Sequence, residues 1–225
     1  PHIAGPFNTL LLVLLLGNIL YVGLVTISQR KLDLMLGYSS VMHMGYIFLG
    51  IVAWNEIGLT GAAFMLIAHG LSIAALFALS GELRERTGTL DFSELGGLAK
   101  SIPTFGLLFG FAVMASIGLP GFANFAGELM VFFGAFSAGV PAHDRFNDFQ
   151  IATVIAVWGV VISAVYMLRA YRRIFLGPLA DRWKSLTDIA PLPKLCVVGL
   201  ILLLLVVGFY PQLLIHLISP ALIRP

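Results

Sequence analysis

Three side chains in this sequence could exchange protons near neutral pH although each stands in an apolar stretch: His43, His69 and Glu128. An imidazole titrates close to neutral pH, and a carboxyl group removed from water favours its uncharged form. At membrane depth a charged group costs on the order of 3 kcal/mol, so it usually pairs with other polar groups or lines an ion path. If these stretches cross a membrane, the three residues are candidates for a buried proton relay.

Hydroxyl groups accompany both histidines at helical spacing. Ser39 and Ser40 stand four and three residues before His43, and Ser72 stands three residues after His69. Residues three or four apart share one face of a helix, where a hydroxyl can bond a backbone carbonyl or hold water beside the imidazole. The alternative is that both histidines only bond to or pack against a neighbouring helix. The sequence leaves these two interpretations open.

The stretch from residue 118 to 136, GLPGFANFAGELMVFFGAF, surrounds Glu128 with apolar residues and places Asn124 one helical turn before it. This favours a carboxyl group that takes up and releases a proton. The structural alternative is an acid that stays protonated and bonds a backbone carbonyl. Two histidines and one carboxylate without diagnostic spacing are weak evidence for a metal, and we expect no metal site.

The composition indicates an all-α integral membrane protein. Of the 225 residues, 59% are hydrophobic and only 11% are charged, whereas soluble domains are about 25% charged. No room remains for a soluble catalytic domain, and no glycine-rich phosphate loop is present. The basic residues are confined to loops between apolar segments, which argues against nucleic acid as a partner.

Apolar segments bounded by charged or Pro- and Gly-bearing loops predict the membrane spans. We place six of them, at about 7–27, 35–53, 57–80, 103–138, 150–174 and 195–217. The fourth would measure about 54 Å as a straight helix, against a hydrocarbon core of about 30 Å. It is therefore either two helices or one broken helix.

Loop charges favour one broken crossing. With a single crossing, one membrane face receives eleven of the thirteen Lys and Arg residues and the other receives only Arg145 and Arg224. With two crossings the asymmetry disappears, although Lys and Arg normally collect on the cytoplasmic side. We therefore expect both ends of this segment on the non-cytoplasmic face, and Lys31 close to a cytoplasmic entrance.

The break itself is expected at Gly118, Pro120 and Gly121. Proline removes a backbone donor, and glycine permits non-helical dihedral angles. Freed backbone groups cannot face lipid, so a broken span must be buried in protein or line a hydrated cavity. Interrupted helices of this kind commonly form ion sites in transporters.

Several stretches together resemble one family: subunit M, or chain 4, of the proton-translocating NADH:quinone oxidoreductase, respiratory complex I. They include LDLMLGYSSVMHMGYIFLGI (32–51), GAAFMLIAHGLSIAALFALSGELRERTGT (61–89), ASIGLPGFANFAGELMVFFGAF (115–136) and RAYRRIFLGP (169–178). The resemblance runs from about residue 28 to 217. It implies a fourteen-span subunit in which these six are the ninth to fourteenth, so that the first eight precede this segment. The broken span would be the discontinuous twelfth helix, in the second of two inverted repeats.

The resemblance also implies roles for individual residues. His43 and His69 resemble the family's central relay histidines, and Glu128 resembles its terminal acid, where related antiporter-like subunits usually carry Lys. Met42 stands where the family usually has Ser, a departure that alters the contacts beside His43.

The family further implies an environment and partners. No flavin, iron-sulfur cluster or quinone site is expected on this chain. The implied partners are neighbouring antiporter-like membrane subunits of complex I, the lipid bilayer, protons and water, in the cell inner membrane. Two alternatives are a subunit of a multisubunit sodium/proton antiporter, and a scaffold whose polar groups only pack helices.

Overall fold

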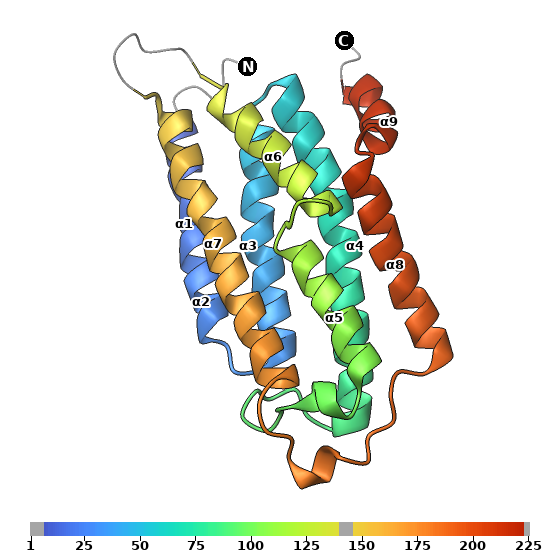
Figure 1. Ribbon diagram of the computed structural model, residues 1–225. Coiled ribbons are helices and arrows are strands. Elements are labelled where there is room, and N and C mark those ends of the chain that lie inside the picture. The colour runs from blue at the N-terminus through green and yellow to red at the C-terminus, as the bar shows by residue number, and fades with distance from the viewer. Residues whose placement is uncertain (1–6, 140–145, 223–225) are drawn as a thin grey trace.

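The protein is a bundle of helices with a common long direction (Figure 1). The computed structural model describes residues 7–139 and 146–222. Its elements are α1 (Asn8–Gly17), the π-helical η2 (Asn18–Val22), α2 (Gly23–Ser28), α3 (Leu32–Val52), α4 (Glu56–Thr87), the short 3₁₀ helix η3 (Leu98–Lys100), α5 (Pro103–Ser116), α6 (Ala123–Phe136), α7 (Asp148–Phe175), the 3₁₀ helix η4 (Asp181–Trp183), α8 (Pro191–Phe209) and α9 (Gln212–Leu222). This confirms the all-α prediction.

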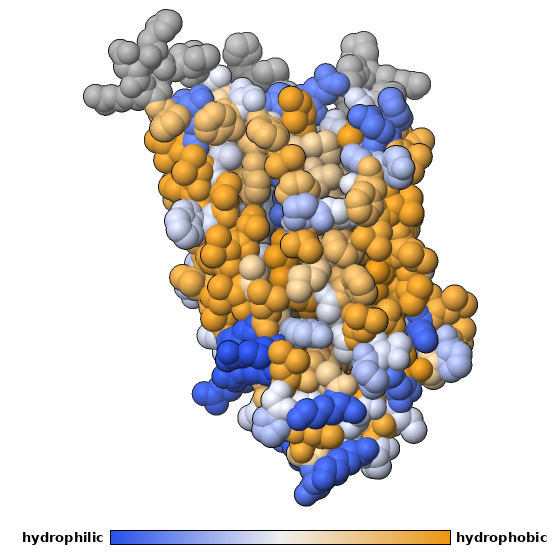
Figure 2. Space-filling model, viewed as in Figure 1, coloured by the Kyte–Doolittle hydropathy of each residue, from blue (hydrophilic) through white to orange (hydrophobic). Residues whose placement is uncertain are grey.

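Five helical stretches are long and apolar enough to cross a membrane: residues 8–28, α3, α4, α7 and α8. Figure 2 shows hydrophobic residues covering the middle of the visible side of the bundle, while hydrophilic residues lie toward its two ends. Leu14, Trp158 and Phe133 are examples of large apolar side chains that are exposed. An outer surface of this kind is suited to lipid, because exposing so many apolar side chains to water would cost free energy.

The fourth predicted segment is broken, as expected. The helices α5 and α6 have 14 residues each and are separated by the non-helical residues 117–122. In Figure 1, α5 begins at the lower end of the bundle and α6 continues to the upper end. Together they make one passage through the bundle. Gly118 and Gly121 have φ angles of +78° and +103°, in the region where glycine meets no steric penalty.

Three of the predicted segments differ in detail from the helices of the structure. The third segment continues as helix to Thr87, well beyond residue 80, because the charged end of α4 packs against loops of the protein. The first is interrupted by the π-helical turn 18–22. The last, predicted at 195–217, is two helices: α8 starts at Pro191 and ends at Phe209, and α9 starts after Pro211, which has no N–H to continue the hydrogen-bond ladder.

Close glycine contacts hold α4 against α3 and α6. A Cβ added at Gly61 would come within 2.7 Å of the Val131 backbone nitrogen, and one added at Gly50 would come equally close to the Gly58 carbonyl oxygen. A Cβ at Gly134 would overlap the Gly58 backbone. Small residues let helices approach in this way in membrane proteins. The helix α4 therefore lies between α3 and α6 with little freedom to shift.

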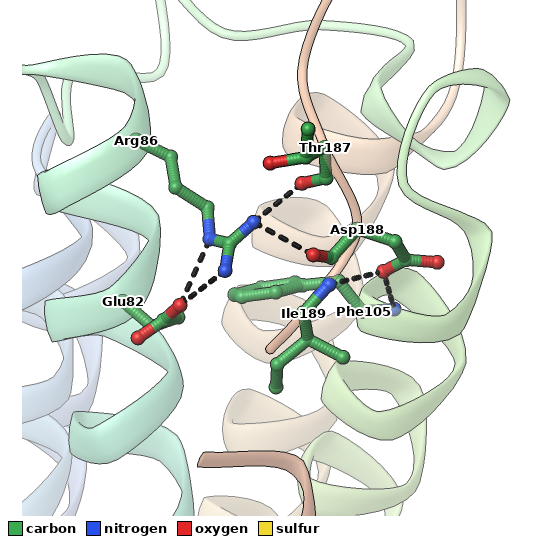
Figure 3. Close-up of polar contacts among 6 residues, drawn as sticks. All are labelled: Glu82, Arg86, Phe105, Thr187, Asp188 and Ile189. Carbon is green, nitrogen blue, oxygen red and sulfur yellow. Dashed lines mark hydrogen bonds and ion pairs between the residues drawn. The ribbon is translucent and has the colours of Figure 1, made fainter. Parts of the chain in front are cut away.

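The connection from α7 to α8 is tied to the lower ends of α4 and α5 (Figure 3). The guanidinium of Arg86 donates to Glu82, one turn earlier on α4, and to the backbone carbonyls of Thr187 and Asp188. The carboxylate of Asp188 accepts hydrogen bonds of 2.9 and 3.0 Å from backbone N–H groups in the first turn of α5. The first half of the broken helix is thereby fixed at its start.

The loop charges gather at one end of the bundle. The connections 29–31, 88–102 and 176–190, with the adjoining helix ends, lie at the lower end in Figure 1 and carry eleven Lys and Arg residues. Arg145 and Arg224 lie outside the described residues. The start of α1 and the whole of α9 lie at the opposite end.

Candidate functional site

Both predicted relay histidines lie inside the bundle, face to face. His43 on α3 and His69 on α4 are buried, and their ring centroids are 4.6 Å apart with an interplanar angle of 17°. Two imidazolium ions at this distance would repel each other strongly. The stacked pair therefore disfavours carrying two extra protons at once.

The backbone of α3 fixes which nitrogen of His43 carries a hydrogen. Its Nδ1 lies 2.8 Å from the carbonyl oxygen of Ser39, one turn earlier. A carbonyl only accepts, so Nδ1 must donate. In the neutral ring Nε2 then has a free lone pair, and within the usual geometric limits this buried atom has no hydrogen-bond partner among the described residues, although the Ser116 backbone also lies close to the ring. Nε2 is accordingly the atom of His43 that can accept a proton.

His69 is connected to both neighbouring helices. Its Nε2 lies 3.0 Å from the Ser40 hydroxyl on α3. On α4 the Ser72 hydroxyl donates to the His69 carbonyl, and Asn124 of α6 donates to the same hydroxyl at 3.1 Å. The predicted supporting residues Ser40, Ser72 and Asn124 thus join α3, α4 and α6 in one polar cluster around the histidines.

Glu128 lies one turn beyond Asn124 on α6, buried, with its carboxyl group against the break between α5 and α6. A Cβ added at Gly118 would overlap this carboxyl group, with Cδ only 3.0 Å away. On another side Gly127 packs on Met65 of α4. No hydrogen bond joins the Glu128 carboxyl group to another described residue within the usual geometric limits. The Gly118 contact places this acid next to the non-helical backbone at membrane depth.

Several buried polar atoms in this region have no hydrogen-bond partner among the described residues. They are His43 Nε2, Tyr46 Oη, His69 Nδ1, Ser116 Oγ and Asn124 Oδ1. Buried polar atoms in proteins are normally bonded to protein or to water. These atoms are contributed by α3, α4, α5 and α6, and they are suited to binding water or a proton in transit.

Other predicted residues lie apart from this cluster. Lys31 is exposed at the start of α3, where its backbone pairs with Asp91, and twelve residues of helix separate it from His43 by about 18 Å. Pro120 is exposed on the outer side of the break. Within residues 7–139 and 146–222, no group of three His, Cys, Asp or Glu side chains could hold a metal ion.

Sequence reasoning missed two tyrosines beside His43. The Tyr166 hydroxyl on α7 lies 2.7 Å from the Ser39 hydroxyl, and the Tyr46 ring meets the His43 ring edge-on at 5.7 Å. Both are fully buried. The available signal was a tyrosine within an apolar span, since a buried tyrosine hydroxyl usually requires a partner.

Comparison with known proteins gives this geometry a context. Residues 2–165 match the family described as NADH:quinone oxidoreductase/Mrp antiporter, TM. The chain belongs to this family. The matched segment contains the stacked histidines, the broken helix and Glu128.

Two relatives within the NADH:quinone oxidoreductase/Mrp antiporter family confirm the resemblance to subunit M. NAD(P)H-quinone oxidoreductase chain 4 of Gloeobacter violaceus is 36% identical over 98% of this chain and 42% of its own length. NADH-quinone oxidoreductase subunit M of Rhodobacter capsulatus is 34% identical over 97% of this chain and 41% of its own length. The chain therefore spans about two fifths of the length of these relatives.

A solved structure supports the same family membership. The chain is similar to a chain of respiratory complex I from Thermus thermophilus with bound NADH, with a TM-score of 0.85 and 29% identity. The similarity covers 97% of this chain and 44% of that one. Family membership of this kind shows the fold and the class of membrane subunit.

Proposed function

We propose that this chain is the C-terminal part of a proton-translocating subunit, of the subunit M type, in NADH:quinone oxidoreductase. Protons move between water, the His43–His69 pair and Glu128, and redox chemistry elsewhere in the assembly drives them. The observation that carries the proposal is the Glu128 carboxyl group, buried against the break between α5 and α6 and one turn from the polar cluster that holds the histidines.

The geometry supports an order of transfer. Nε2 of His43 is the open proton acceptor, and the stacked ring of His69 lies next to it. Asn124, one turn before Glu128 on α6, is linked through the Ser72 hydroxyl to the backbone carbonyl of His69, which holds α4 and α6 together at this level. A proton that reaches Glu128 meets non-helical backbone and a polar break, where water can enter at lower cost than along an intact apolar helix. Lys31 would lie close to the cytoplasmic entrance.

The surroundings of the chain follow from the same proposal. Its partners are the neighbouring antiporter-like membrane subunits of complex I and the lipid bilayer, in the cell inner membrane. The oxidoreductase activity belongs to the whole assembly, and this chain supplies proton transfer. Both ends of the segment then lie on the non-cytoplasmic face.

A subunit of a multisubunit sodium/proton antiporter is the second candidate, because the matching family also covers Mrp antiporters. The two functions differ in their driving force. Proton uptake into membrane vesicles that depends on NADH oxidation favours the first, and uptake driven by a sodium gradient without a redox substrate favours the second.

Replacement of Glu128 by Gln tests the proton role. The amide keeps the size of the side chain but cannot release a proton, so proton translocation per assembled complex should largely disappear while the subunit still inserts. Translocation is measured as NADH-driven acidification of vesicles, normalised to the amount of assembled subunit. Glu128→Asp, which keeps a carboxyl group, should retain part of the rate.

The outcome also tests the scaffold alternative. If the Gln variant lowers only the amount of assembled complex, with unchanged translocation per complex, Glu128 serves packing and the relay proposal is wrong.

A further inference from the structure

Tyr166 has no place in the relay described above, although its hydroxyl lies in the interior next to His43. It projects from α7, is 1% exposed, and bonds the Ser39 hydroxyl at 2.7 Å. The same hydroxyl lies 3.8 Å from the sulfur of Met42. Tyr166 therefore contacts both residue 39 and residue 42 of α3, which are one helical turn apart.

The directions of these hydrogen bonds can be assigned from the partners. Tyr166 has one proton to donate, and a thioether sulfur can only accept. If Tyr166 donates to Met42, its oxygen accepts from Ser39, and every hydroxyl proton has an acceptor. If Tyr166 donates to Ser39 instead, the Ser39 proton has no acceptor among the described residues. The first arrangement, from Ser39 to Tyr166 to Met42, is the better satisfied one.

This chain of bonds cannot conduct a proton. It ends on the sulfur of Met42, which does not take up and pass on protons as water or a hydroxyl does. Met42 also fills a confined space, with its sulfur 3.2 Å from where a Cβ of Gly23 would be and its methyl group 3.1 Å from that position at Gly159. Tyr166 thus lies beside the relay without being a carrier.

What Tyr166 holds is the turn of α3 that orients His43. Ser39 bonds Tyr166 through its hydroxyl and the His43 Nδ1 through its carbonyl. The residue that fixes the tautomer of His43 is thus itself fixed to α7. We propose that Tyr166 is a positioning residue for proton transfer, which clamps the Ser39–Met42 turn so that His43 keeps its hydrogen on Nδ1 and presents Nε2 as acceptor.

This inference rests on the proposed relay, and the variants that test it distinguish a failure of the positioning role from a failure of the relay. Tyr166→Phe removes only the hydroxyl. Tyr171→Phe is the control, because it removes a tyrosine hydroxyl from the same helix at a position that packs on Phe175 and Gly110 and does not touch the histidines. Both variants are made in the full subunit within its assembled complex.

The first readout is the tautomer of His43, from the nitrogen resonances of histidine-labelled protein in membranes. The parent and Tyr171→Phe should show the Nδ1–H form, and Tyr166→Phe should show a mixture. The second readout is translocation against pH. Tyr166→Phe should be slower by about fivefold, the effect of one net hydrogen bond, with a displaced pH profile, and Tyr171→Phe should match the parent in rate and pH profile.

A double variant checks that Tyr166 acts through Ser39. Ser39→Ala should reproduce the Tyr166→Phe phenotype, and the two together should be no slower than either alone, because each already breaks the same hydroxyl pair. An unchanged His43 tautomer in Tyr166→Phe, or a translocation profile that overlays the parent, would overturn the positioning role. Normal translocation by Glu128→Gln would instead contradict the relay, whatever the tautomer shows.

Discussion

At the scale of single residues, the proposed proton transfer depends most on the contact between Gly118 and Glu128. Gly118 has a positive φ and lies directly against the Glu128 carboxyl group. Any side chain at this position would both strain the backbone and push the acid away from the break. The glycine is therefore required twice, for the turn and for the space that the carboxyl group occupies.

Gly118→Ala should separate these two requirements when it is compared with Gly121→Ala. Both positions have positive φ, and an alanine there costs about 1–2 kcal/mol of backbone strain. The Cβ of the control finds only the Phe209 ring, 3.4 Å away. We expect both variants to melt at lower temperature, but only Gly118→Ala to lose translocation per assembled complex. Equal translocation in the two variants would argue against a functional carboxyl group at the break.

The sequence was sufficient to select His43, His69 and Glu128 and to bring Ser40, Ser72 and Asn124 into their neighbourhood. Helical spacing alone places those polar groups on shared faces. It could not reveal the Ser39–Tyr166 bond, because that contact depends on the rotation and depth of α7 against α3. It also could not give the tautomer of His43, which depends on one carbonyl distance. Whether the cluster carries protons stays a prediction.

At the scale of elements, the start of the broken helix is fixed by Asp188. Its carboxylate caps the first turn of α5, while its own backbone carbonyl accepts from Arg86 (Figure 3). Burial raises the pKa of the Asp188 carboxyl group, but hydrogen bonds from Ile189, Thr104 and Phe105 outweigh it, and the net pKa lies below its ordinary value. The carboxylate form is therefore the one that the fold stabilises.

Asp188→Ala should lower the stability of the protein by about 1 kcal/mol, the usual effect of losing a helix N-cap. The Arg86 bonds go to backbone carbonyls and survive the change. Asp181→Ala is the control, because Asp181 only pairs with Lys184 on the exposed surface, where such a pair contributes less than about 1 kcal/mol. Thermal unfolding in detergent, monitored by circular dichroism, compares the stability of the two variants.

The difference in stability between the parent and Asp188→Ala should depend on pH in a definite direction. A carboxyl group whose pKa is lowered by folding stabilises above its unfolded pKa of about 3.9, and this contribution is lost as pH falls through the folded value. The difference in free energy of unfolding between the parent and Asp188→Ala should therefore be constant near neutral pH and should disappear only in acid, below about pH 4. A stability difference that already decreases between pH 8 and pH 6 would contradict a lowered pKa for Asp188.

Helices and breaks were predicted best where the length and composition of a segment determine them. The length of the fourth segment and the loop charges predicted a single broken crossing, and α5 and α6 lie end to end as one broken passage through the bundle. The π-helical turn 18–22 was not predicted, since it depends on contacts such as the Asn18 side chain donating to the Val41 carbonyl of α3. The end of α8 was missed because apolar residues continue through Pro211, which marks the real boundary.

At the scale of the whole molecule, the charge asymmetry predicts orientation. The basic connections lie together at one end of the bundle, and Lys and Arg collect on the cytoplasmic face of membranes. Exposed serines mark the two ends: Ser93 in the connection 88–102 and Ser137 after α6.

Cysteine labelling tests this orientation. In a Cys196→Ala background, Ser93→Cys should react with a membrane-impermeant maleimide only from the cytoplasmic side, and Ser137→Cys only from the opposite side. Each residue is exposed, so a failure to react would not be caused by burial. The reversed pattern would invert the orientation, and labelling of both cysteines from one side would contradict the single broken passage.

The central claim is that Glu128 gains and loses a proton during turnover, and infrared difference spectroscopy of the assembled complex tests it most directly. Spectra are recorded with and without NADH, for the parent and for Glu128→Gln. The relay predicts that the C=O band of a protonated carboxylic acid changes on turnover in the parent and that this signal is missing from the Gln variant. Identical carboxylic acid signals in the two proteins would contradict it.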